Sequence, residues 1–506
     1  MDKNRGSFLT AISAVFLTFI NGLFALVITK EIILLYGSDF NGLNASANQF
    51  ISMLLIVEGG FTIASNVALF KPMAIKDYVS INAILSATHK IFNKIGIIFF
   101  SVGTILSIFY ASIINSEISP FMSFLIFFMT IVSTFVNLYF ATKYRILLQS
   151  ENKEYVLNNM QSLTSVLSQT LILITIFFNG HFLLIRFSTM LGAIINSYLI
   201  ASVTKAKYKF IDFEVLPDYT SIKGTNDLFI QKITGMIYST IPLLFISATV
   251  GTIYASIYVV YNNVIRLIKS IIYSFINAPV MSFGKLLAEK DKNYILKIFL
   301  QYEYIVIFIL SAFLSTTTVL IMPFIEIYIR DITDINYFNW NIAIMLILIT
   351  FFEIIHIPSG NIINISGKFK VGKNIQSISS FVIIITMLIG NRYFGFYGII
   401  FAVLFTAIVL GALEIVYVHK VFFNNSLMDF MNILFPSITI SILVILLEIN
   451  YLPVISNYLD FFIWGALIII LNSAILVVVG FIFNRSIFFE VKERITIFIK
   501  MVMNKS

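Results

Sequence analysis

The sequence predicts an all-α, polytopic membrane protein with about fourteen transmembrane helices, and three observations lead to that prediction. Of the 506 residues, 59% are hydrophobic and only 11% are charged, whereas water-soluble domains carry about 25% charged residues. Apolar stretches of membrane length follow one another along the chain. Lys and Arg gather in alternate connections between these stretches, as expected for cytoplasmic loops. This composition excludes a water-soluble enzyme, a disordered chain and a fibrous protein.

The chain contains no cysteine, and its net charge is +8. The lack of cysteine excludes disulfides, thiolate catalysis and cysteine-bound zinc. Lysines in cytoplasmic loops explain the positive charge, so we expect no nucleic-acid partner. The four histidines stand on separate segments, and the sequence has no glycine-rich phosphate loop or metalloprotease motif. We therefore expect no catalytic residues, no metal and no cofactor.

The first apolar segment runs from Phe8 to about Thr29 and follows Lys3 and Arg5. A signal peptide has an apolar core of about 7–15 residues and a small-residue cleavage site. This segment is longer and lacks such a site. We expect an uncleaved first transmembrane helix whose N-terminus lies in the cytoplasm.

The remaining spans are predicted from stretches that approach the length of about 20 residues that a bilayer requires. They are, in order, about residues 43–70, 94–113, 120–142, 157–178, 182–203, 229–251, 253–276, 298–325, 340–364, 375–390, 395–417, 433–449 and 461–483. No connection between them is long enough for a second, soluble domain.

Alternating the loops from this start places both termini in the cytoplasm. Of the 33 Lys and Arg, only Lys30, Arg186, Arg330 and Arg392 then fall on the outer side. One span more or fewer would scramble this bias, so it supports the predicted number. Both tryptophans fall at predicted outer helix ends, where interfacial aromatics are common.

The C-terminal stretch 484–503 has apolar residues at helical spacing, with its charged residues mostly on the opposite face. We expect an amphipathic cytoplasmic helix here. It either lies on the inner leaflet or caps the helix bundle.

An internal repeat organises the chain. The pattern K-x-x-A-x-K-D occurs at positions 71–77 and again at positions 285–291. Shifting the first six spans by the distance between these two copies places each near one of the next six. Because six is an even number, the two halves share one orientation, which is the parallel-repeat architecture of transporters. We predict an N-lobe at 1–203, a cytoplasmic linker at 204–228, a C-lobe at 229–420, two extra helices at 421–483 and the tail at 484–506.

Several segments carry a family resemblance, among them "VEGGFTIASNVALFKPMA" at 57–74, "YRILLQSENKEYV" at 144–156, "QKITGMIYSTIPLLFIS" at 231–247 and "SFGKLLAEKD" at 282–291. With these segments and its 6 + 6 + 2 plan, the chain resembles the multidrug/oligosaccharidyl-lipid/polysaccharide (MOP) flippase superfamily. Within it, the chain is most similar to the bacterial polysaccharide-repeat flippases of the Wzx type.

This resemblance implies a flippase that moves undecaprenyl-diphosphate-linked oligosaccharide across the bacterial inner membrane by alternating access. The product would be lipopolysaccharide O-antigen, capsule or another surface polysaccharide. The implied partners are the polyprenyl-diphosphate-linked oligosaccharide, the lipid bilayer and a polysaccharide polymerase complex. The protein would not be an enzyme.

Basic residues inside the spans are the candidates for binding the substrate's head group. Arg266 and Lys269 share one face of the predicted eighth helix, and Arg266 lies about 20 Å from its outer end. Because guanidinium binds phosphate through a bidentate fork, we expect Arg266, helped by Lys269, to attract the lipid diphosphate. Lys143 and Arg145, at the inner end of the fourth helix, are further candidates. The alternative for all four is a positive-inside anchor.

The first helix supplies one polar candidate, Asn21. Relatives that flip lipid-linked peptidoglycan precursor carry basic residues along this helix. Here the helix has no internal Arg or Lys, so we expect a site that differs from theirs.

Four acidic residues lie inside predicted spans: Glu58, Glu303, Glu353 and Glu414. A carboxylate beside a histidine can hold or pass a proton, and Glu353 and His356 are three residues apart. With Glu58 they are the candidates for coupling to an H⁺ or Na⁺ gradient. The alternative is a buried ion pair, for example between Glu58 and Arg266. Glu303 and Glu414 lie near inner helix ends, where we expect an interfacial role.

Two other functions stay open. A cation-coupled multidrug exporter of the same superfamily would favour an acidic cavity, which Arg266 and Lys269 oppose. A membrane polymerase or glycosyltransferase would present a sizeable outer loop for its chemistry, and the predicted outer loops are short.

Overall fold

The computed structural model describes residues 3–222, 226–276 and 291–503, together with Phe283, Leu286 and Glu289. Throughout these residues the regular elements are helices. They are α1 (Lys3–Leu54), α2 (Ile56–Ile75), α3 (Tyr78–Ile113), α4 (Pro120–Val136), the π-helix η1 (Asn137–Ala141), α5 (Thr142–Ser150), α6 (Glu154–Phe177), α7 (Leu183–Lys207), α8 (Asn226–Thr249), α9 (Thr252–Ile276), α11 (Lys292–Ile329), α12 (Trp340–Ile355), α13 (Ile357–Ile365), α14 (Phe369–Val416), the π-helix η2 (Tyr417–Phe422), α15 (Leu427–Tyr451), α16 (Tyr458–Phe483) and α17 (Arg485–Met503).

The all-α, multi-pass architecture is confirmed. Twelve helical segments of the described chain are long and apolar enough to cross a membrane. Two of them contain a break. Gly37 in α1 and Gly395 in α14 have φ of 84° and 53°, values that glycine adopts readily. Unbroken, these helices of 52 and 48 residues would be about 78 and about 72 Å long, more than twice the bilayer core of about 30 Å. Each therefore supplies two passes, in agreement with the predicted number.

Several helices continue beyond the spans that hydropathy predicts. Helix α3 begins at Tyr78, although the sequence predicts a connection over 71–93, and α11 extends from Lys292 to Ile329. Hydropathy detects only the part of a helix that lies in lipid. The polar turns that continue it into water leave no such signal.

The chain forms two compact units. Unit 1 comprises residues 1–264 and 394–399, and unit 2 comprises 265–393 and 400–506. Unit 1 therefore includes α8 and the first half of α9, beyond the sequence-based N-lobe. The predicted lobe and linker boundaries stay predictions.

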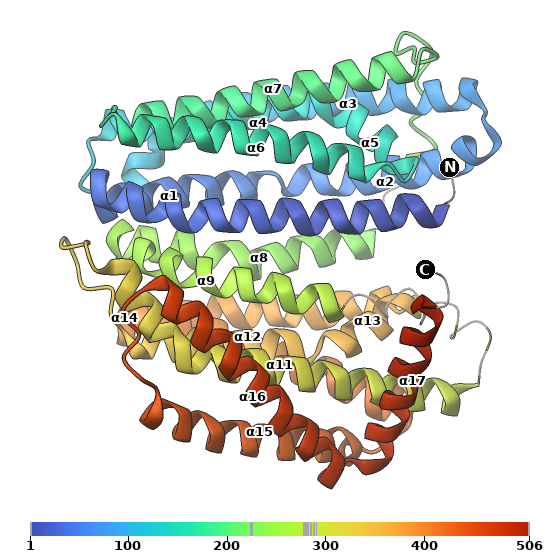
Figure 1. Cartoon of the computed structure of the whole chain (residues 1–506). Helices are drawn as coiled ribbons and strands as arrows, with labels where there is room; N and C mark the ends of the chain where they lie inside the picture. Colours follow the sequence, from blue (N-terminus) through green and yellow to red (C-terminus); the bar gives the residue numbers. More distant parts are fainter. Residues whose placement is uncertain are drawn as a thin grey trace. The chain divides into compact units, whose positions relative to one another are not determined.

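Unit 1 is a bundle in which α6 packs against α1 and α7, and α4 packs against α3 and α7 (Figure 1). Aromatic rings fill its centre. Tyr110 stacks on Phe127 with ring centroids 4.4 Å apart, and Phe50 meets Phe127 edge-on at 5.1 Å. Such ring pairs add about 0.5–1.5 kcal/mol beyond the burial of their surface.

The segment after α7 is ordered against α3. The side chain of Asn82 donates to the Phe210 carbonyl at 2.7 Å, and Ser86 donates to the Phe213 carbonyl at 2.9 Å. Farther along, hydrogen bonds from Ser221 and Thr220 lower the pKa of Asp218 to about 2, so this turn keeps its charge in mild acid. The described residues of the predicted linker that follow α7 therefore pack against α3 and belong to unit 1.

Gly42 marks a close approach of α1 to another backbone segment in unit 1. A Cβ built on Gly42 would overlap the backbone carbonyl group of Thr252, at the start of α9. Backbone atoms cannot move aside as a flexible side chain can, so only glycine fits.

We expect Gly42→Ala to destabilise the protein by about 3 kcal/mol, the upper end of what overpacking typically costs. The measurement is thermal unfolding of the purified variant in detergent. Gly235→Ala is the matched control, because a Cβ there meets nothing within 4 Å. Equal stability of both variants would contradict the close approach.

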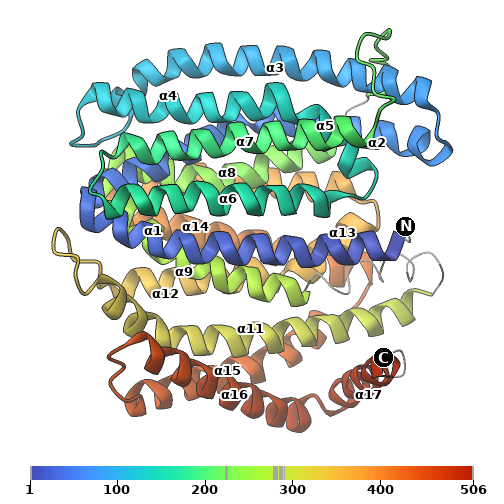
Figure 2. The same ribbon diagram turned by 45° about the horizontal axis from the view of Figure 1, so that its top comes forward.

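Unit 2 is organised around α11, which packs against α12, α15 and α16 (Figure 2). Residues 452–457, between α15 and α16, are not helical and lie along α11. Ile455 is buried in a cluster with Val319 and Ile327, and Arg330 donates to the Ser456 carbonyl at 2.8 Å. This connection covers the Ile329 end of α11.

The C-terminal segment forms a helix, α17, where the sequence predicts one, and this helix is attached to α11. Lys297 pairs with Glu490 at 2.7 Å, and the Gln301 amide donates to the same carboxylate at 2.6 Å. Near the end of α16, the Tyr304 hydroxyl lies so close to Gly480 that a Cβ there would displace it. A position on the inner leaflet stays a prediction.

The repeat is visible in the backbone. Gly37 and Gly251 both have positive φ. They are separated by the same number of residues as the two copies of the sequence pattern. Asn152 and Gly367, at almost the same separation, do so as well. Asp77 and Asp291 cap α3 and α11 by accepting from the backbone N–H three residues on. Lys285, Ala288 and Lys290 of the sequence pattern lie outside the described residues.

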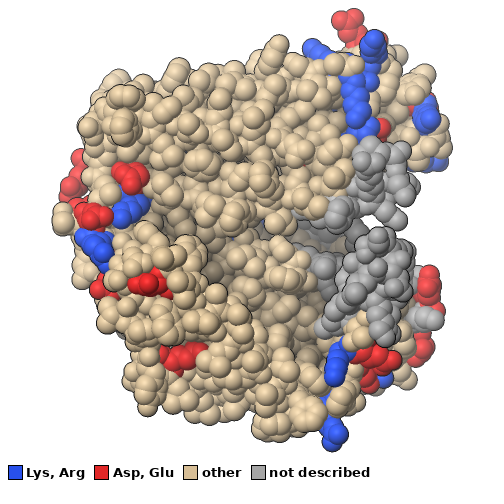
Figure 3. Space-filling view, in the orientation of Figure 1, with Lys and Arg blue, Asp and Glu red and all other residues tan. Residues whose placement is uncertain are grey.

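Charged side chains gather at the helix ends. On the face drawn in Figure 3, Lys and Arg lie near the ends of the helices, and most of the surface between them is uncharged. This is the distribution that a bilayer imposes, because loop lysines stay in water while the helix centres face lipid.

Candidate functional site

In unit 1 the structure brings Glu58 and Arg145 to one polar cavity. The cavity has a volume of about 190 Å³ and lies between α2, α4, η1, α5, α6 and α7. Besides these two charged residues, its polar lining consists of Thr134, Asn137, Thr142, Gln161 and Asn196. The sequence predicts Glu58 and Arg145 as members of two separate sites. In the structure, both residues line the same cavity.

Local irregularities of the backbone open this cavity. Helix α1 ends at Leu54 and α2 starts at Ile56, so Glu58 stands in the first turn of a new helix. On the facing side, α4 widens into the π-helix that begins at Asn137. π-Helical turns interrupt regular packing and are frequent at functional sites.

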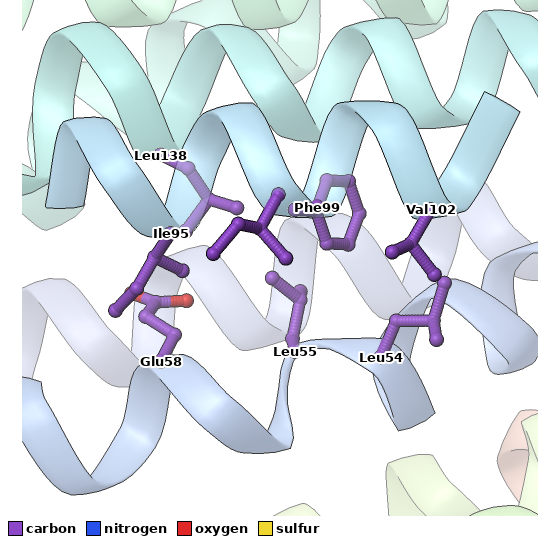
Figure 4. A pocket seen from close by; sticks show the side chains of 8 residues that line it. Leu54, Leu55, Glu58, Ile95, Phe99, Val102 and Leu138 are labelled. Atoms are coloured by element: carbon purple, nitrogen blue, oxygen red, sulfur yellow. The ribbon is translucent and has the colours of Figure 1, made fainter.

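Glu58 also borders a second, apolar pocket of about 160 Å³, next to the polar cavity. Figure 4 shows its side chain rising from α2 toward α3, with Ile95 and Leu138 beside the carboxylate. Glu58 therefore lies between a polar and an apolar space. A carboxylate in such a place is sensitive to changes in either lining.

Two cations of unit 1, Arg145 and Lys232, attract the Glu58 carboxylate electrostatically. Lys232, on α8, lies against Gly59, where a Cβ would collide with the Nζ end of its side chain. The glycine after Glu58 therefore admits this lysine. The alternative pairing of Glu58 with Arg266 stays a prediction.

Lys143 and Asn21 have partners of their own in unit 1. The Lys143 ammonium is buried, 2.9 Å from His89 Nδ1 and above the Phe213 ring. Asn21 Oδ1 accepts from the Gln169 side chain at 2.9 Å, which joins α1 to α6. Neither residue lines the polar cavity with Arg145.

In unit 2, Lys269 of α9 forms an ion pair with Glu353 of α12. Arg266, one turn earlier on α9, has an exposed side chain. Since α9 begins at Thr252, Arg266 lies about 21 Å along the helix from that end. The structure thus joins a predicted head-group residue to a predicted coupling residue.

Glu353 and His356 are not partners, although they are three residues apart. The helix breaks at His356, between α12 and α13, and this residue pairs instead with Glu414 of α14 at 2.8 Å. Gly360 allows the contact, because a Cβ there would lie 2.7 Å from a Glu414 carboxylate oxygen. The i, i+3 rule fails here because it assumes an unbroken helix.

The predicted interfacial role of Glu303 and Glu414 is wrong. Glu303 is only 1% exposed and Glu414 only 3%. The Glu303 carboxylate lies 3.0 Å from the ring of His419 in η2. Both acids are paired with histidines inside the protein. Position along a helix alone does not reveal whether a residue faces lipid, water or another helix.

Solved structures with this architecture are similar to between 81% and 95% of this chain. "Lipid II flippase MurJ, inward closed conformation" has a TM-score of 0.67 at 16% identity, covering 95% of this chain and 99% of that one. An inward-facing multidrug resistance MATE family transporter of the MOP superfamily has a TM-score of 0.62 at 12% identity, covering 81% and 94%.

This chain has the MOP transporter fold. A third MOP structure, a transporter from Pyrococcus furiosus Vc1, has a TM-score of 0.54 at 13% identity and covers 86% and 96%. At the level of sequence, neither a family model nor a curated protein matches the chain.

Within this MOP fold, Arg186 is a buried cation that sequence reasoning missed. The alternation of loops assigns it to the outer side, yet it is 3% exposed. Its guanidinium donates to Asn48 Oδ1 at 2.9 Å and to the Asn44 carbonyl at 2.7 Å. The polar residues clustered at positions 38–48 of α1 were the signal that could have found it.

Proposed function

We propose that this protein is a flippase that moves an undecaprenyl-diphosphate-linked oligosaccharide from the inner to the outer leaflet of the bacterial cytoplasmic membrane by alternating access. The observation that carries the proposal is the structural similarity to the lipid II flippase. The match covers 95% of this chain and 99% of that one. MATE transporters cover less of this chain, between 81% and 87%. A flippase fold thus matches nearly all of this chain, helices beyond the repeat included.

The chemistry of unit 2 supports an anionic substrate. Arg266 carries a charge that is fixed at all relevant pH values and can bind a phosphate in a bidentate manner. Lys269 is paired with Glu353, so it is available to a diphosphate only when that pair opens. Arg266 is therefore the primary head-group residue of the proposal, and Lys269 the secondary one.

A cation-coupled multidrug exporter is the second candidate, since MATE transporters are also structurally similar. The experiment that separates the two uses the purified protein in liposomes with a fluorescent polyprenyl-diphosphate oligosaccharide. A flippase exposes this lipid to a membrane-impermeant quencher, and competing organic cations have no effect. An exporter instead transports the organic cation and leaves the lipid where it was.

Within this function, Glu58 is the coupling residue that we propose for unit 1. We expect Glu58→Gln to abolish the dependence of flipping on an imposed H⁺ or Na⁺ gradient while the protein still binds substrate. The measurement is the flipping rate in liposomes with and without each gradient. Glu117→Gln, at an exposed loop position, is the control. An unchanged gradient dependence in Glu58→Gln would remove Glu58 from this role.

A further inference from the structure

In unit 1 the polar cavity and the apolar pocket adjoin each other. Leu55, Glu58 and Leu138 line both spaces, whose volumes are about 190 and about 160 Å³. Figure 4 shows Glu58 at one end of the apolar pocket, with Leu54 and Val102 at the other end. The two spaces therefore meet at one carboxylate, with polar walls on one side of it and apolar walls on the other. The proposed function assigns no role to the apolar part.

The polar cavity lies at head-group depth, and the apolar pocket lies within the hydrocarbon core. Arg145, in the cavity, is about 37 Å along the helical segment that starts at Pro120, which exceeds the bilayer core of about 30 Å. Val102, in the pocket, is only about 17 Å from Ile113, the end of α3 that precedes Pro120. The pocket thus extends from the cavity toward the middle of the membrane, as the chains of a lipid extend from its head group.

The apolar pocket opens to the surroundings of unit 1 along α3. Its lining residues Ile98 and Val102 are 51% and 44% exposed. Ile97, Ile105 and Ile108 continue this exposed apolar surface along the helix. In a helix that spans the membrane, such a surface faces the lipid chains. An acyl chain can therefore enter the pocket from the side.

The polar cavity presents a cation and a carboxylate that do not pair with each other. Among the residues that the structure describes, the Arg145 side chain has neither a hydrogen bond nor an ion pair, and the Glu58 carboxylate accepts only from Thr62, at 3.5 Å. Lys232 attracts Glu58 electrostatically but lines neither space. Charges that are partly removed from water without a partner cost stability. The cavity therefore suits a ligand that carries an opposite charge for each of them.

We propose that this composite site binds a phospholipid whose head group carries a phosphate and a primary ammonium, as in phosphatidylethanolamine. The phosphate binds Arg145, because guanidinium holds phosphate through a bidentate fork. The ammonium donates to Glu58, and one acyl chain occupies the apolar pocket. The cavity has the volume of about six water molecules in the liquid, which is room for a phosphoethanolamine group.

The charges of the cavity disfavour other head groups. Phosphatidylglycerol or a polyprenyl diphosphate satisfies Arg145, but its negative charge is repelled by Glu58. Phosphatidylcholine has the right charges, but its quaternary ammonium has no N–H to donate to Glu58. The inference requires neither a lipid-linked sugar nor an ion gradient, so it stands or fails separately from the proposed function.

The test uses the purified full-length protein in detergent with added dioleoyl-phosphatidylethanolamine, dioleoyl-phosphatidylcholine or dioleoyl-phosphatidylglycerol. Native mass spectrometry measures the dissociation constant of the first lipid that binds. We expect the ethanolamine lipid to bind at least about tenfold more tightly than either of the others, because it alone makes charged hydrogen bonds to both residues.

Variants of the two charged residues should change the lipid preference in different ways. Glu58→Gln removes the repulsion, so phosphatidylglycerol should bind as tightly as phosphatidylethanolamine. Arg145→Gln should weaken both lipids by about tenfold or more. Lys94→Gln, at an exposed position on α3 that lines neither space, is the control and should keep the wild-type preference. A preference is a ratio measured on one folded protein, so a general loss of stability does not imitate the effect.

Val102→Trp tests the apolar part, because it fills the pocket from an exposed position. We expect it to weaken the binding of all three lipids. The proposal is overturned if the wild type binds the three lipids equally or prefers phosphatidylcholine or phosphatidylglycerol. It is also overturned if the preference for phosphatidylethanolamine persists in Glu58→Gln, or if Val102→Trp leaves lipid binding unchanged.

Discussion

Reversing the charge at Arg266 is expected to abolish export of surface polysaccharide in a strain that lacks other flippases. Arg266 is an exposed residue. It lies about 21 Å along α9, deeper than an anchor at either surface needs to be. Hydrogen bonds to charged groups contribute about 1.5–3 kcal/mol, so Arg266→Ala should weaken substrate binding about 10- to 100-fold. Arg266→Glu adds repulsion of the diphosphate and should leave no measurable export.

The control for Arg266 is Arg392→Glu, which reverses an exposed charge at a predicted outer position and should leave export intact. Arg266→Lys should give an intermediate rate, because lysine keeps the charge and loses the bidentate geometry. Protein amounts in the membrane are compared by immunoblot. Full export by a normally expressed Arg266→Glu variant would contradict the proposed role.

Removing the imidazole of His419 is expected to destabilise unit 2 strongly. His419 and Glu303 are 3.0 Å apart, and their side chains are 0% and 1% exposed. Loss of one partner leaves the other buried and uncompensated, which typically costs about 3–5 kcal/mol. His419→Leu should therefore lower Tm strongly and reduce the amount of folded protein in the membrane.

The double variant Glu303→Leu/His419→Leu tests the physical reason for this loss. Replacement of a buried ion pair by apolar residues of similar volume is often neutral or stabilising. The double variant should therefore recover most of the Tm that His419→Leu loses. If it is as unstable as the single variant, the loss came from packing against Phe299 and Phe430, whose rings flank His419.

The helices and their order could be predicted from the sequence because lipid imposes a simple rule on each span. Apolar residues must cover the length of the bilayer, and loop lysines mark one side. The breaks at Gly37 and Gly395 are predicted only as ends of spans. Nothing in the hydropathy distinguishes a turn between helices from a glycine inside one.

The partners of the charged residues could not be predicted in the same way. Glu353 and His356 look like a pair because spacing in the sequence is all that a single chain displays. Their actual partners, Lys269 and Glu414, come from helices that are far away in the sequence. Which faces of distant helices meet depends on tertiary packing, and that information is absent from local periodicity.

The contacts between α17 and α11 make the last helix a suitable place to attach a probe of unit 2. Because the Glu490 carboxylate is held by both Lys297 and Gln301, the position of the last helix is coupled to that of α11. The chain has no cysteine. A single cysteine introduced at the exposed position Lys492 therefore accepts one spectroscopic label, and the motion of unit 2 in a membrane becomes directly observable from outside the bilayer.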